Sequence, residues 1–280
     1  MKAHFVCVRG LRTRYLAAGN GPALLLVHPV GYPAEVFARL MPILADRYTL
    51  IAADVPGQGF SAAPSDWGMA PQLFMTDHML ALMEQLGISQ YAVLGSSLGG
   101  LIAALIALRA PERVNKLILV GTGSVFNLPA TQPQSLQAVY ENGARAYADP
   151  SLATCRQRLA NTCHHLPEAE DILLTQITAY ALPGAAQAYR QIIEGVAATI
   201  ADPACNAYDH LAEIAAPTLV ILGSQDKRTS VPAHREGVAR MRDARLIEIA
   251  DCGHLPFLEQ PQQFGAALSD FLHDKRCTAP

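Results

Sequence analysis

The chain has 280 residues, of which 51% are hydrophobic and 16% charged, and its formal net charge of −3, without any cluster of lysine or arginine, argues against a nucleic-acid partner. Its longest apolar segments, such as LIAALIAL, are shorter than the roughly 20 residues of a membrane span, and MKAHFVCVRG lacks the apolar core of a secretory signal. We therefore expect a cytoplasmic protein without a membrane partner, long enough for one large α/β domain.

The expected elements alternate between strand and helix along the chain. HFVCV and TRYLA, on either side of residues 9–10, predict an N-terminal antiparallel hairpin. Continuous apolar runs predict strands covered on both faces: ALLLVH, YTLIAAD, YAVLG, KLILVG and, after a long gap, PTLVILG and ARLIEIA. Helical patterns separate or follow these runs, at residues 34–46, 71–86, 97–109, 232–241 and 261–273. Such alternation implies right-handed crossovers and an α/β fold with a mostly parallel central sheet flanked by helices.

The pattern changes between Gly121 and Pro217. This stretch is rich in alanine, has helical periodicity broken by prolines, and contains no strand-like run. We interpret it as a helical cap inserted over the carboxyl edge of the sheet, where open α/β sheets bind their ligands. The expected division is a first part of the core at 1–121, the cap at 122–216 and a second part of the core at 217–280.

The turn LGSSLGG lies between a predicted strand and a predicted helix, and its residues 95–99 match G-x-S-x-G. In that context the serine, Ser97, occupies a strained turn from which its Oγ projects clear of the sheet. Free N–H groups at the start of the helix stabilise negative charge at the same place. A plain Gly-Ser turn is one alternative. A phosphate loop is the other, but G-x-G-x-x-G requires glycine where Ser97 stands. We therefore interpret Ser97 as a nucleophile.

A serine nucleophile needs a base to take its proton and a carboxylate to orient the base. The expected order along this kind of fold is serine, acid, histidine. Asp226 follows the predicted strand PTLVILG, and His254 follows ARLIEIA. Neighbouring strand ends converge on one edge of a parallel sheet, so we expect Ser97, Asp226 and His254 to meet there.

Acyl transfer also needs two N–H donors for the oxyanion of its tetrahedral intermediate. The first expected donor is Leu98, directly after the nucleophile. The second should come from the loop that follows ALLLVH; since Pro29 has no N–H, we predict Val30. His28, at the end of that strand, is expected to be structural and to hold this loop.

The segments VHPVG, DVPGQGFS, GSSLGG, LGSQD and CGHLPFLEQP together resemble the α/β-hydrolase fold superfamily, and the resemblance runs along nearly the whole chain. It implies that the five residues named above are the catalytic triad, on its nucleophile elbow, and the oxyanion hole. Members commonly have His-Gly where this chain has His28-Pro29, and the proline stiffens that loop.

The resemblance also limits which reactions of the superfamily fit this sequence. Ser97 argues against haloalkane dehalogenases and epoxide hydrolases, which have an aspartate nucleophile, and Leu255 argues against hydroxynitrile lyases, which have lysine after the base. The cap is similar to that of meta-cleavage product hydrolases, which cut carbon–carbon bonds, but these usually have an aromatic residue at position 255. The resemblance thus implies a serine esterase or lactonase that forms an acyl-enzyme on Ser97. Carbon–carbon hydrolysis is the first alternative; a lyase or synthase and a small-molecule receptor also stay open.

The composition of the cap predicts its ligand. It consists mostly of Ala, Leu, Ile and Val, which indicates a small to medium apolar substrate. The residues predicted to contact this substrate are Phe126, Leu128, Tyr180 and Leu255. Three cap arginines could bind a carboxylate, but we expect them to be solvated on polar helix faces: Arg156, Arg158 and Arg190. The sequence leaves a homodimer open.

Six cysteines are scattered without a CxxC pair, which is typical of free thiols in a reducing compartment. Cys155, Cys163, His164 and His165 lie close together in sequence, but their spacing matches no zinc pattern. We therefore predict no metal site, and the proposed chemistry requires no cofactor.

Overall fold

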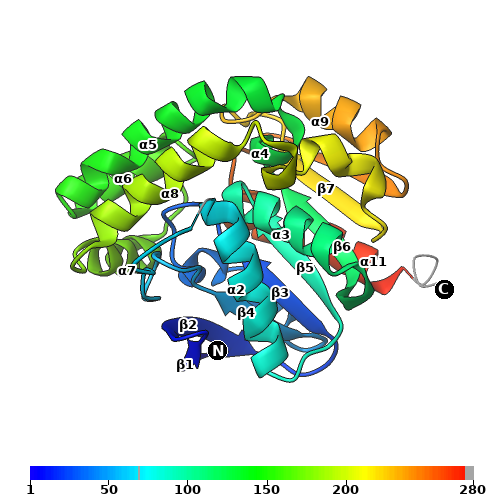
Figure 1. The fold of residues 1–280 in the computed structure, drawn as a ribbon, viewed down its shortest axis with the longest axis horizontal. Coiled ribbons are helices and arrows are strands. Elements are labelled where there is room, and N and C mark those ends of the chain that lie inside the picture. Colours follow the sequence, from blue (N-terminus) through cyan, green and yellow to red (C-terminus); the bar gives the residue numbers. More distant parts are fainter. Residues whose placement is uncertain (69, 275–280) are drawn as a thin grey trace.

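Eight strands form one central sheet in the computed structural model, which describes residues 1–68 and 70–274 (Figure 1). The strands are β1 (Lys2–Val8), β2 (Leu11–Ala18), β3 (Ala23–Val27), β4 (Thr49–Ala53), β5 (Tyr91–Ser96), β6 (Val114–Val120), β7 (Thr218–Gly223) and β8 (Ala244–Ile249). Their order across the sheet is β1-β2-β4-β3-β5-β6-β7-β8. The β1–β2 and β2–β4 pairs are antiparallel, and the other pairs are parallel. The predicted α/β fold with a mostly parallel sheet is confirmed.

Helices cover both faces of this sheet. Those of the core are α1 (Met41–Leu44), α2 (Pro71–Gln85), α3 (Leu98–Arg109), α9 (Val231–Ala239), α10 (Pro256–Glu259) and α11 (Pro261–His273). Figure 1 shows α2 and α3 in front of the sheet and α11 behind it. Residues 34–46, predicted as one helix, form instead a 3-10 turn at Ala34–Phe37 and the short α1. Pro42 explains the break, because a proline fits only the first turn of a helix.

The central strands carry the apolar runs that the sequence displays. β3, β5, β6 and β7 are buried along almost their whole length, and the leucines of β3 expose none of their surface. The edge strands β1 and β8 are partly exposed. Because the central strands are parallel, their carboxyl ends lie at one edge, and the loops that follow them converge there.

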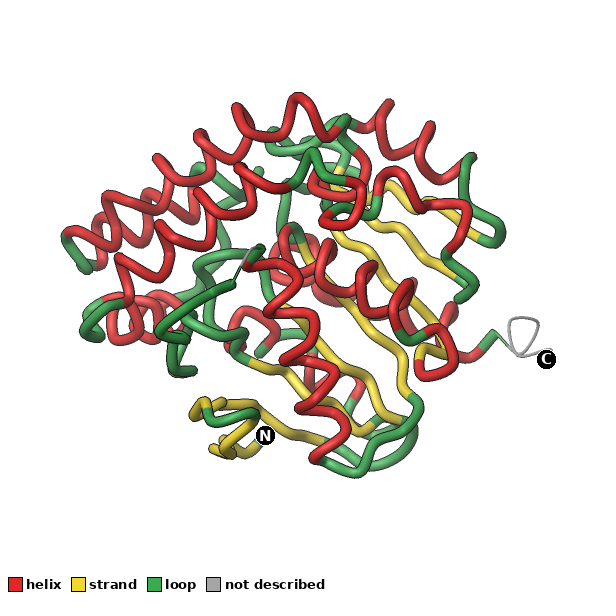
Figure 2. Tube along the Cα trace, in the orientation of Figure 1, coloured by secondary structure: helices red, strands yellow, loops and turns green. Residues whose placement is uncertain are grey.

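A layer of helices, here called the cap, connects β6 to β7. Its helices are α4 (Gly123–Phe126), α5 (Gln132–Ala148), α6 (Leu152–Ala160), α7 (Glu170–Tyr180) and α8 (Ala185–Thr199), and no strand lies among them in this fully described stretch. Figure 2 shows these helices arched over one edge of the sheet. They fill the stretch predicted to be the cap, while the division of the chain into core and cap units stays a prediction.

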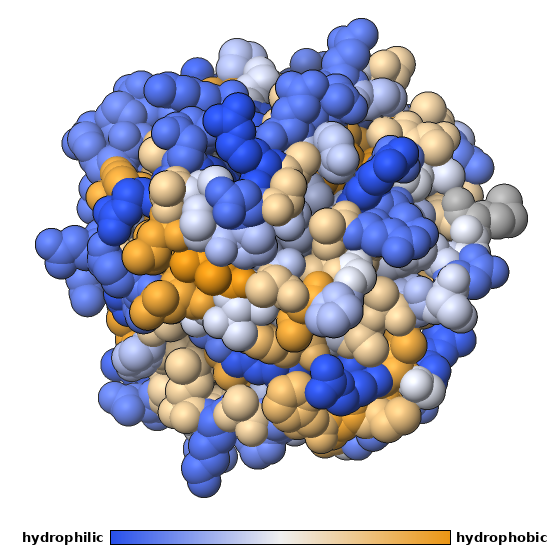
Figure 3. All heavy atoms as spheres, turned by 90° about the vertical axis from the view of Figure 1, so that its left-hand side faces the viewer, coloured by the Kyte–Doolittle hydropathy of each residue, from blue (hydrophilic) through white to orange (hydrophobic). Residues whose placement is uncertain are grey.

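The outer surface of the cap mixes apolar and polar side chains. Several of its leucines are exposed: Leu128, Leu152, Leu166, Leu174 and Leu182. Figure 3, which views the molecule from this side, shows apolar surface interrupted by polar groups. Among residues 1–68 and 70–274, no helix combines the length and the apolar character that crossing a membrane demands. The homodimer stays a prediction.

A buried histidine on α2 gives a testable pH dependence of stability. His78 Nε2 lies 2.7 Å from Thr13 Oγ1, and Nδ1 has no partner in the described part of the chain. Burial lowers the pKa of His78 from 6.5 to about 4. Below pH 6.5 the unfolded chain therefore binds a proton at His78, whereas the folded chain binds it only near pH 4. The free energy of unfolding therefore decreases as the pH is lowered from 6.5 toward 4.

We expect His78→Gln to remove this contribution. Between pH 7 and pH 5 the free energy of unfolding of the variant should fall by about 2 kcal/mol less than that of the unmodified protein. Urea unfolding at the two pH values measures the difference. Equal pH dependence in the two proteins would contradict the expectation.

Candidate active site

Ser97 stands in the turn between β5 and α3. Its backbone has φ 54° and ψ −120°, a left-handed conformation that costs free energy for a residue with a side chain. The turn is also tight, since a Cβ on Gly95 would lie 2.0 Å from the Gly99 carbonyl oxygen, and one on Gly99 would lie 2.3 Å from that of Val27. Glycine is thus required on both sides of Ser97. This is the strained strand–turn–helix that the G-x-S-x-G pattern predicts.

The Ser97 carbonyl is fixed by the first residues after β6. Thr122 Oγ1 donates to it at 2.9 Å and Ser124 Oγ at 3.0 Å. The Ser97 N–H donates to the Val120 carbonyl at 2.9 Å. These bonds tie the turn to the neighbouring strand, so the backbone of Ser97 is held in its strained conformation by the core of the protein.

His254 and Asp226 meet although 28 residues separate them. His254 Nδ1 lies 2.8 Å from Asp226 Oδ2, and the Asp226 side chain is fully buried. The other oxygen, Oδ1, accepts a hydrogen bond from the backbone N–H of Arg228 at 2.7 Å. Because a buried carboxylate accepts hydrogen bonds, the imidazole proton belongs on Nδ1, which leaves Nε2 as a proton acceptor.

The turn that carries His254 is organised by Glu259, a residue that the sequence analysis did not single out. The Glu259 carboxylate accepts the N–H groups of Gly253 at 3.0 Å and Leu255 at 3.3 Å, on either side of His254. It also accepts the N–H of His164 at 2.8 Å, from the segment between α6 and α7. In the sequence, the feature that could have identified Glu259 is its position as a glutamate directly after PFL, in an otherwise apolar stretch.

One cavity brings the candidate residues together under the cap. Its wall consists of Pro29, Val30, Tyr32, Ser97, Leu98, Gly123, Ser124, Asn127, Gln132, Ser135, Leu136, Val139, Asn142, Arg158, Thr162, Arg228 and His254. Ser97 and His254 therefore border the same space, with the two predicted oxyanion donors beside them. Their catalytic roles stay predictions.

The loop after β3, residues 28–32, is here called the β3 loop. His28 Nε2 accepts the Val55 N–H at 3.0 Å, so its ring proton is on Nδ1, which donates to the Pro29 carbonyl at 2.9 Å. Burial lowers the pKa of His28 and keeps the ring neutral. The Val30 N–H has no acceptor among the described residues. As the first residue of α3, Leu98 also has no acceptor for its N–H within that helix.

None of the four residues predicted to contact substrate lines this cavity. Phe126 is buried against the His234 ring, with 4.6 Å between ring centroids, and Leu255 is wholly buried in the core. Leu128 is 56% exposed on the outer surface. Tyr180 is buried and donates its hydroxyl hydrogen to the Gly31 carbonyl. These four residues thus pack within the protein or face solvent, whereas the apolar cap residues Leu136 and Val139 line the cavity together with polar side chains.

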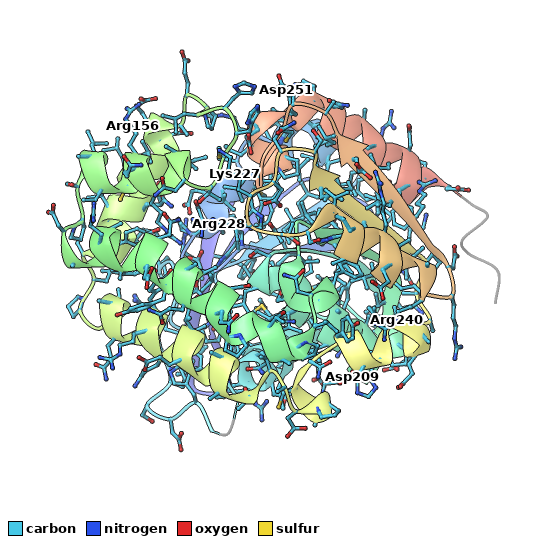
Figure 4. The ribbon with its side chains drawn as sticks, turned by 90° about the horizontal axis from the view of Figure 1, so that it is seen from above. Arg156, Asp209, Lys227, Arg228, Arg240 and Asp251 are labelled. Atoms are coloured by element: carbon cyan, nitrogen blue, oxygen red, sulfur yellow. The ribbon has the colours of Figure 1, made fainter. Side chains whose placement is uncertain are left out.

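The cap arginines do not share one environment. Arg156 pairs with Glu170 and Arg190 with Glu194, all on the surface, as predicted. Figure 4 shows Arg156 at the outer edge of the cap. For Arg158 the prediction is wrong, because this side chain is buried and borders the cavity.

The residues considered for a metal site lie apart from the cavity wall. Cys155 and Cys163 are buried thiols. His164 Nε2 lies 3.1 Å from Asp251 Oδ1, and His165 Nε2 lies 3.0 Å from Oδ2 of the same carboxylate. The described cysteines form no disulfide with one another, and Cys277 lies outside the described residues.

Comparison with known proteins identifies the family of the chain. The family model for the alpha/beta hydrolase fold matches residues 22–261. A 2-hydroxymuconate semialdehyde hydrolase of Pseudomonas sp. (strain CF600) is 28% identical over 98% of this chain and 95% of its own length. A pimeloyl-acyl-carrier-protein methyl ester esterase of Chromobacterium violaceum is 30% identical over 91% of this chain and 95% of its own.

A solved structure shows the same fold. It is a serine hydrolase involved in carbazole degradation, with a TM-score of 0.81 at 22% identity, and the match covers 97% of this chain and 98% of that one. The family match spans most of the chain, and the two relatives are named as a hydrolase and an esterase. The chain belongs to the α/β-hydrolase fold family.

Proposed function

We propose that the protein hydrolyses a carboxylic ester or a lactone through an acyl-enzyme on Ser97. The observation that carries this proposal is the cavity in which Ser97, on its strained turn, and His254, bonded to Asp226, border the same space. A serine, a correctly oriented imidazole and two N–H donors are the parts that acyl transfer needs.

In the proposed reaction His254 Nε2 takes the proton of Ser97 as Oγ attacks the substrate carbonyl. The N–H groups of Val30 and Leu98 receive the negative charge on the carbonyl oxygen. The intermediate collapses, the ester C–O bond breaks and the departing alkoxide takes the proton from His254. Water, deprotonated by His254 in turn, then attacks the acyl group and releases the acid with Ser97 restored.

Carbon–carbon hydrolysis is the second candidate, and the likeness to 2-hydroxymuconate semialdehyde hydrolase favours it. The esterase relative, at 30% identity, and the non-aromatic Leu255 after the base favour the ester reaction. Multiple turnover of a 4-nitrophenyl ester, with fluorophosphonate labelling of Ser97, supports ester hydrolysis. Labelling with poor ester turnover supports the carbon–carbon reaction, and neither labelling nor turnover supports a receptor.

The cavity wall favours a negative charge on the small to medium apolar substrate that the cap predicts. Arg158 and Arg228 both border the cavity, and no aspartate or glutamate does so in the described part of the chain. Within the described part of the chain the Arg228 guanidinium makes only long hydrogen bonds, to the carbonyls of Ala138 at 3.5 Å and Asn161 at 3.4 Å. We propose that Arg228 binds a carboxylate of the substrate.

Replacing Arg228 with glutamine tests this charge preference. We expect kcat/KM for a 4-nitrophenyl hemiester of glutaric acid to fall about tenfold, or ~1.4 kcal/mol, and that for neutral 4-nitrophenyl butyrate to change less than about twofold. Lys227→Gln is the matched control, since Lys227 is the exposed neighbour on the same loop (Figure 4) and is absent from the cavity wall. An equal loss on both esters would contradict the proposal.

A further inference from the structure

Two consecutive carbonyl groups of the β3 loop are bound by an arginine of the cap. Arg158, on α6, donates from Nη2 to the Val30 carbonyl at 2.9 Å and from Nη1 to the Gly31 carbonyl at 2.7 Å. The Tyr180 hydroxyl, on α7, donates to the same Gly31 carbonyl. Two cap helices therefore hold a loop that lies more than a hundred residues earlier in the chain.

Packing alone does not account for a charged residue at this position. Arg158 is 3% exposed, and its hydrogen-bond acceptors among the described residues are the two carbonyls and the Tyr180 hydroxyl. Burial raises the pKa of Tyr180 well above 10, so this tyrosine is neutral and supplies no counter-charge. Removing a cation from water without an ionic partner is unfavourable, and an apolar side chain of similar volume would fill the space without that cost.

The neighbouring aromatic rings hold the guanidinium in place. Its central carbon lies 4.7 Å from the centroid of the Tyr32 ring, 5.5 Å from that of Tyr180 and 5.6 Å from that of Tyr189. Cation–π contacts of this kind partly offset the loss of hydration. Arg158 is thus fixed in orientation, with both terminal nitrogens directed at the β3 loop.

The β3 loop contains a turn with two possible states. The Tyr32 N–H donates to the Pro29 carbonyl at 3.1 Å, and Gly31 has φ 74°, which are the marks of a type II β-turn. In a type I turn the central peptide, between Val30 and Gly31, is rotated by about 180°. Glycine at the third position favours the type II state, and the bonds that the central peptide makes further influence which state forms.

That central peptide is bound on both sides. Its carbonyl, on Val30, accepts from Arg158, and its N–H, on Gly31, donates to Gln58 Oε1. Without Arg158 the Val30 carbonyl would lose its donor inside the protein, and the central peptide would rotate to reach another. Arg158 therefore selects one state of the turn.

The preceding peptide carries the candidate oxyanion donor. Its carbonyl, on Pro29, accepts from His28 Nδ1, and its N–H, on Val30, has no acceptor among the described residues. The N–H and C=O of a trans peptide point in opposite directions, so these bonds set the direction of the Val30 N–H. A rotation of the adjoining peptide changes the Val30 backbone and disturbs that direction.

We propose that Arg158 is a positioning residue for the reaction: it holds the β3 loop in the state in which the Val30 N–H receives the oxyanion, so the oxyanion hole is complete only when α6 is docked on the core. This inference rests on the proposed hydrolysis at Ser97. It makes the cap a part of the catalytic apparatus as well as a cover over the substrate.

The test compares Arg158→Met and Arg158→Lys with Arg156→Met. Arg156 is the control because it lies on the same helix but is exposed and paired with Glu170. For each variant kcat and KM are measured on 4-nitrophenyl butyrate and on its thiono analogue, whose sulfur fits an oxyanion hole poorly. A misplaced donor lowers kcat on the oxygen ester and reduces the preference for the oxygen ester over the sulfur analogue. If Arg158 had a purely structural role, its replacement would leave this preference unchanged.

We expect Arg158→Met to lower kcat about 100-fold, the loss typical of one oxyanion donor, with KM changed less than about threefold and the oxygen-to-sulfur preference reduced about tenfold. Arg158→Lys can donate a hydrogen bond to one of the two carbonyls, so its kcat should be about tenfold higher than that of Arg158→Met. Arg156→Met should match the unmodified protein. Unchanged kcat and preference in both Arg158 variants, or a loss confined to KM, would overturn the proposal.

Two further measurements keep the result unambiguous. Far-UV circular dichroism and thermal unfolding test whether each variant is folded. If Arg158→Met does not fold, Arg158→Lys alone decides: a reduced oxygen-to-sulfur preference supports the proposal, and an unchanged preference overturns it. The rate of Ser97 phosphonylation by a fluorophosphonate depends on the same N–H donors but not on ester turnover. Absent turnover in the unmodified protein refutes the proposed function, whereas an unchanged phosphonylation rate in every folded Arg158 variant refutes the positioning role.

Discussion

Replacing Ser97 with alanine is expected to lower kcat on a 4-nitrophenyl ester by about a million-fold, the loss typical of removing a triad nucleophile. The Ser97 Oγ makes no hydrogen bond within the described part of the chain, so its removal leaves no buried group without a partner. Alanine has a Cβ, as serine does, on a residue whose φ is 54°, so the backbone strain of the turn is unchanged. Initial rates and thermal unfolding measure the two outcomes, and we expect the unfolding temperature to stay within a few degrees.

Ser96→Ala is the matched control for this variant. Ser96 is the preceding residue, at the end of β5, and its Oγ is buried without a partner among the described residues. The substitution removes the same atom one position away, and we expect kcat to change less than about twofold because Ser96 does not line the cavity. Turnover retained by the Ser97 variant, or lost in the Ser96 variant, would contradict the assignment of the nucleophile.

Asp226→Asn is expected to lower kcat about 10⁴-fold at neutral pH while the protein stays folded. The Arg228 N–H requires an acceptor, so the amide oxygen should take the place of Oδ1. The amide nitrogen then faces His254 Nδ1 and donates to it. That bond moves the ring proton to Nε2, the atom that must accept the proton of Ser97, so the imidazole is present but in the wrong tautomer.

The control for Asp226→Asn is Asp251→Asn. Asp251 lies only three positions before His254 but is 69% exposed and pairs with His164 and His165. We expect kcat of the Asp251 variant to stay within about threefold of the original, since Asp251 is exposed and does not line the cavity. A severe loss in the Asp251 variant with a mild one in the Asp226 variant would reverse the assignment of the acid.

The fold could be predicted from the sequence because its central strands are buried on both faces. Such strands appear as unbroken apolar runs, and the alternation with helices leaves few topologies open. The prediction failed at residues 34–46, where periodicity indicated one helix and Pro42 interrupts it. There a local steric rule outweighs a pattern averaged over several turns.

The candidate triad was predictable for a related reason. Chemistry at the end of a parallel strand depends on where the strand stops, and the sequence marks the ends of β5, β7 and β8 by Ser97, by Asp226 and by His254. The wall of the cavity was not predictable in the same way. Composition indicates that a cap helix is amphipathic, but it does not tell which side chains lie at its inner face.

Arg158 illustrates the missing information. Arg156 and Arg158 are two positions apart, so about 200° separates them around a helix and both cannot face solvent on one polar side. Arg158 shares the buried stripe of α6 with Cys155 and Leu159, at helical spacing. That spacing could have identified Arg158 as the inward residue, but its contact with the β3 loop depends on how α6 docks, which no local pattern contains.

The most direct test of this account is to trap the acyl-enzyme. The protein is mixed with excess 4-nitrophenyl butyrate, quenched in acid within milliseconds to seconds, and measured by intact-protein mass spectrometry followed by peptide mapping. We predict one butyryl group per chain, located on the peptide that contains Ser97, which disappears in water at a rate no slower than kcat. Steady turnover without a covalent adduct, or an adduct on any other side chain, would contradict it.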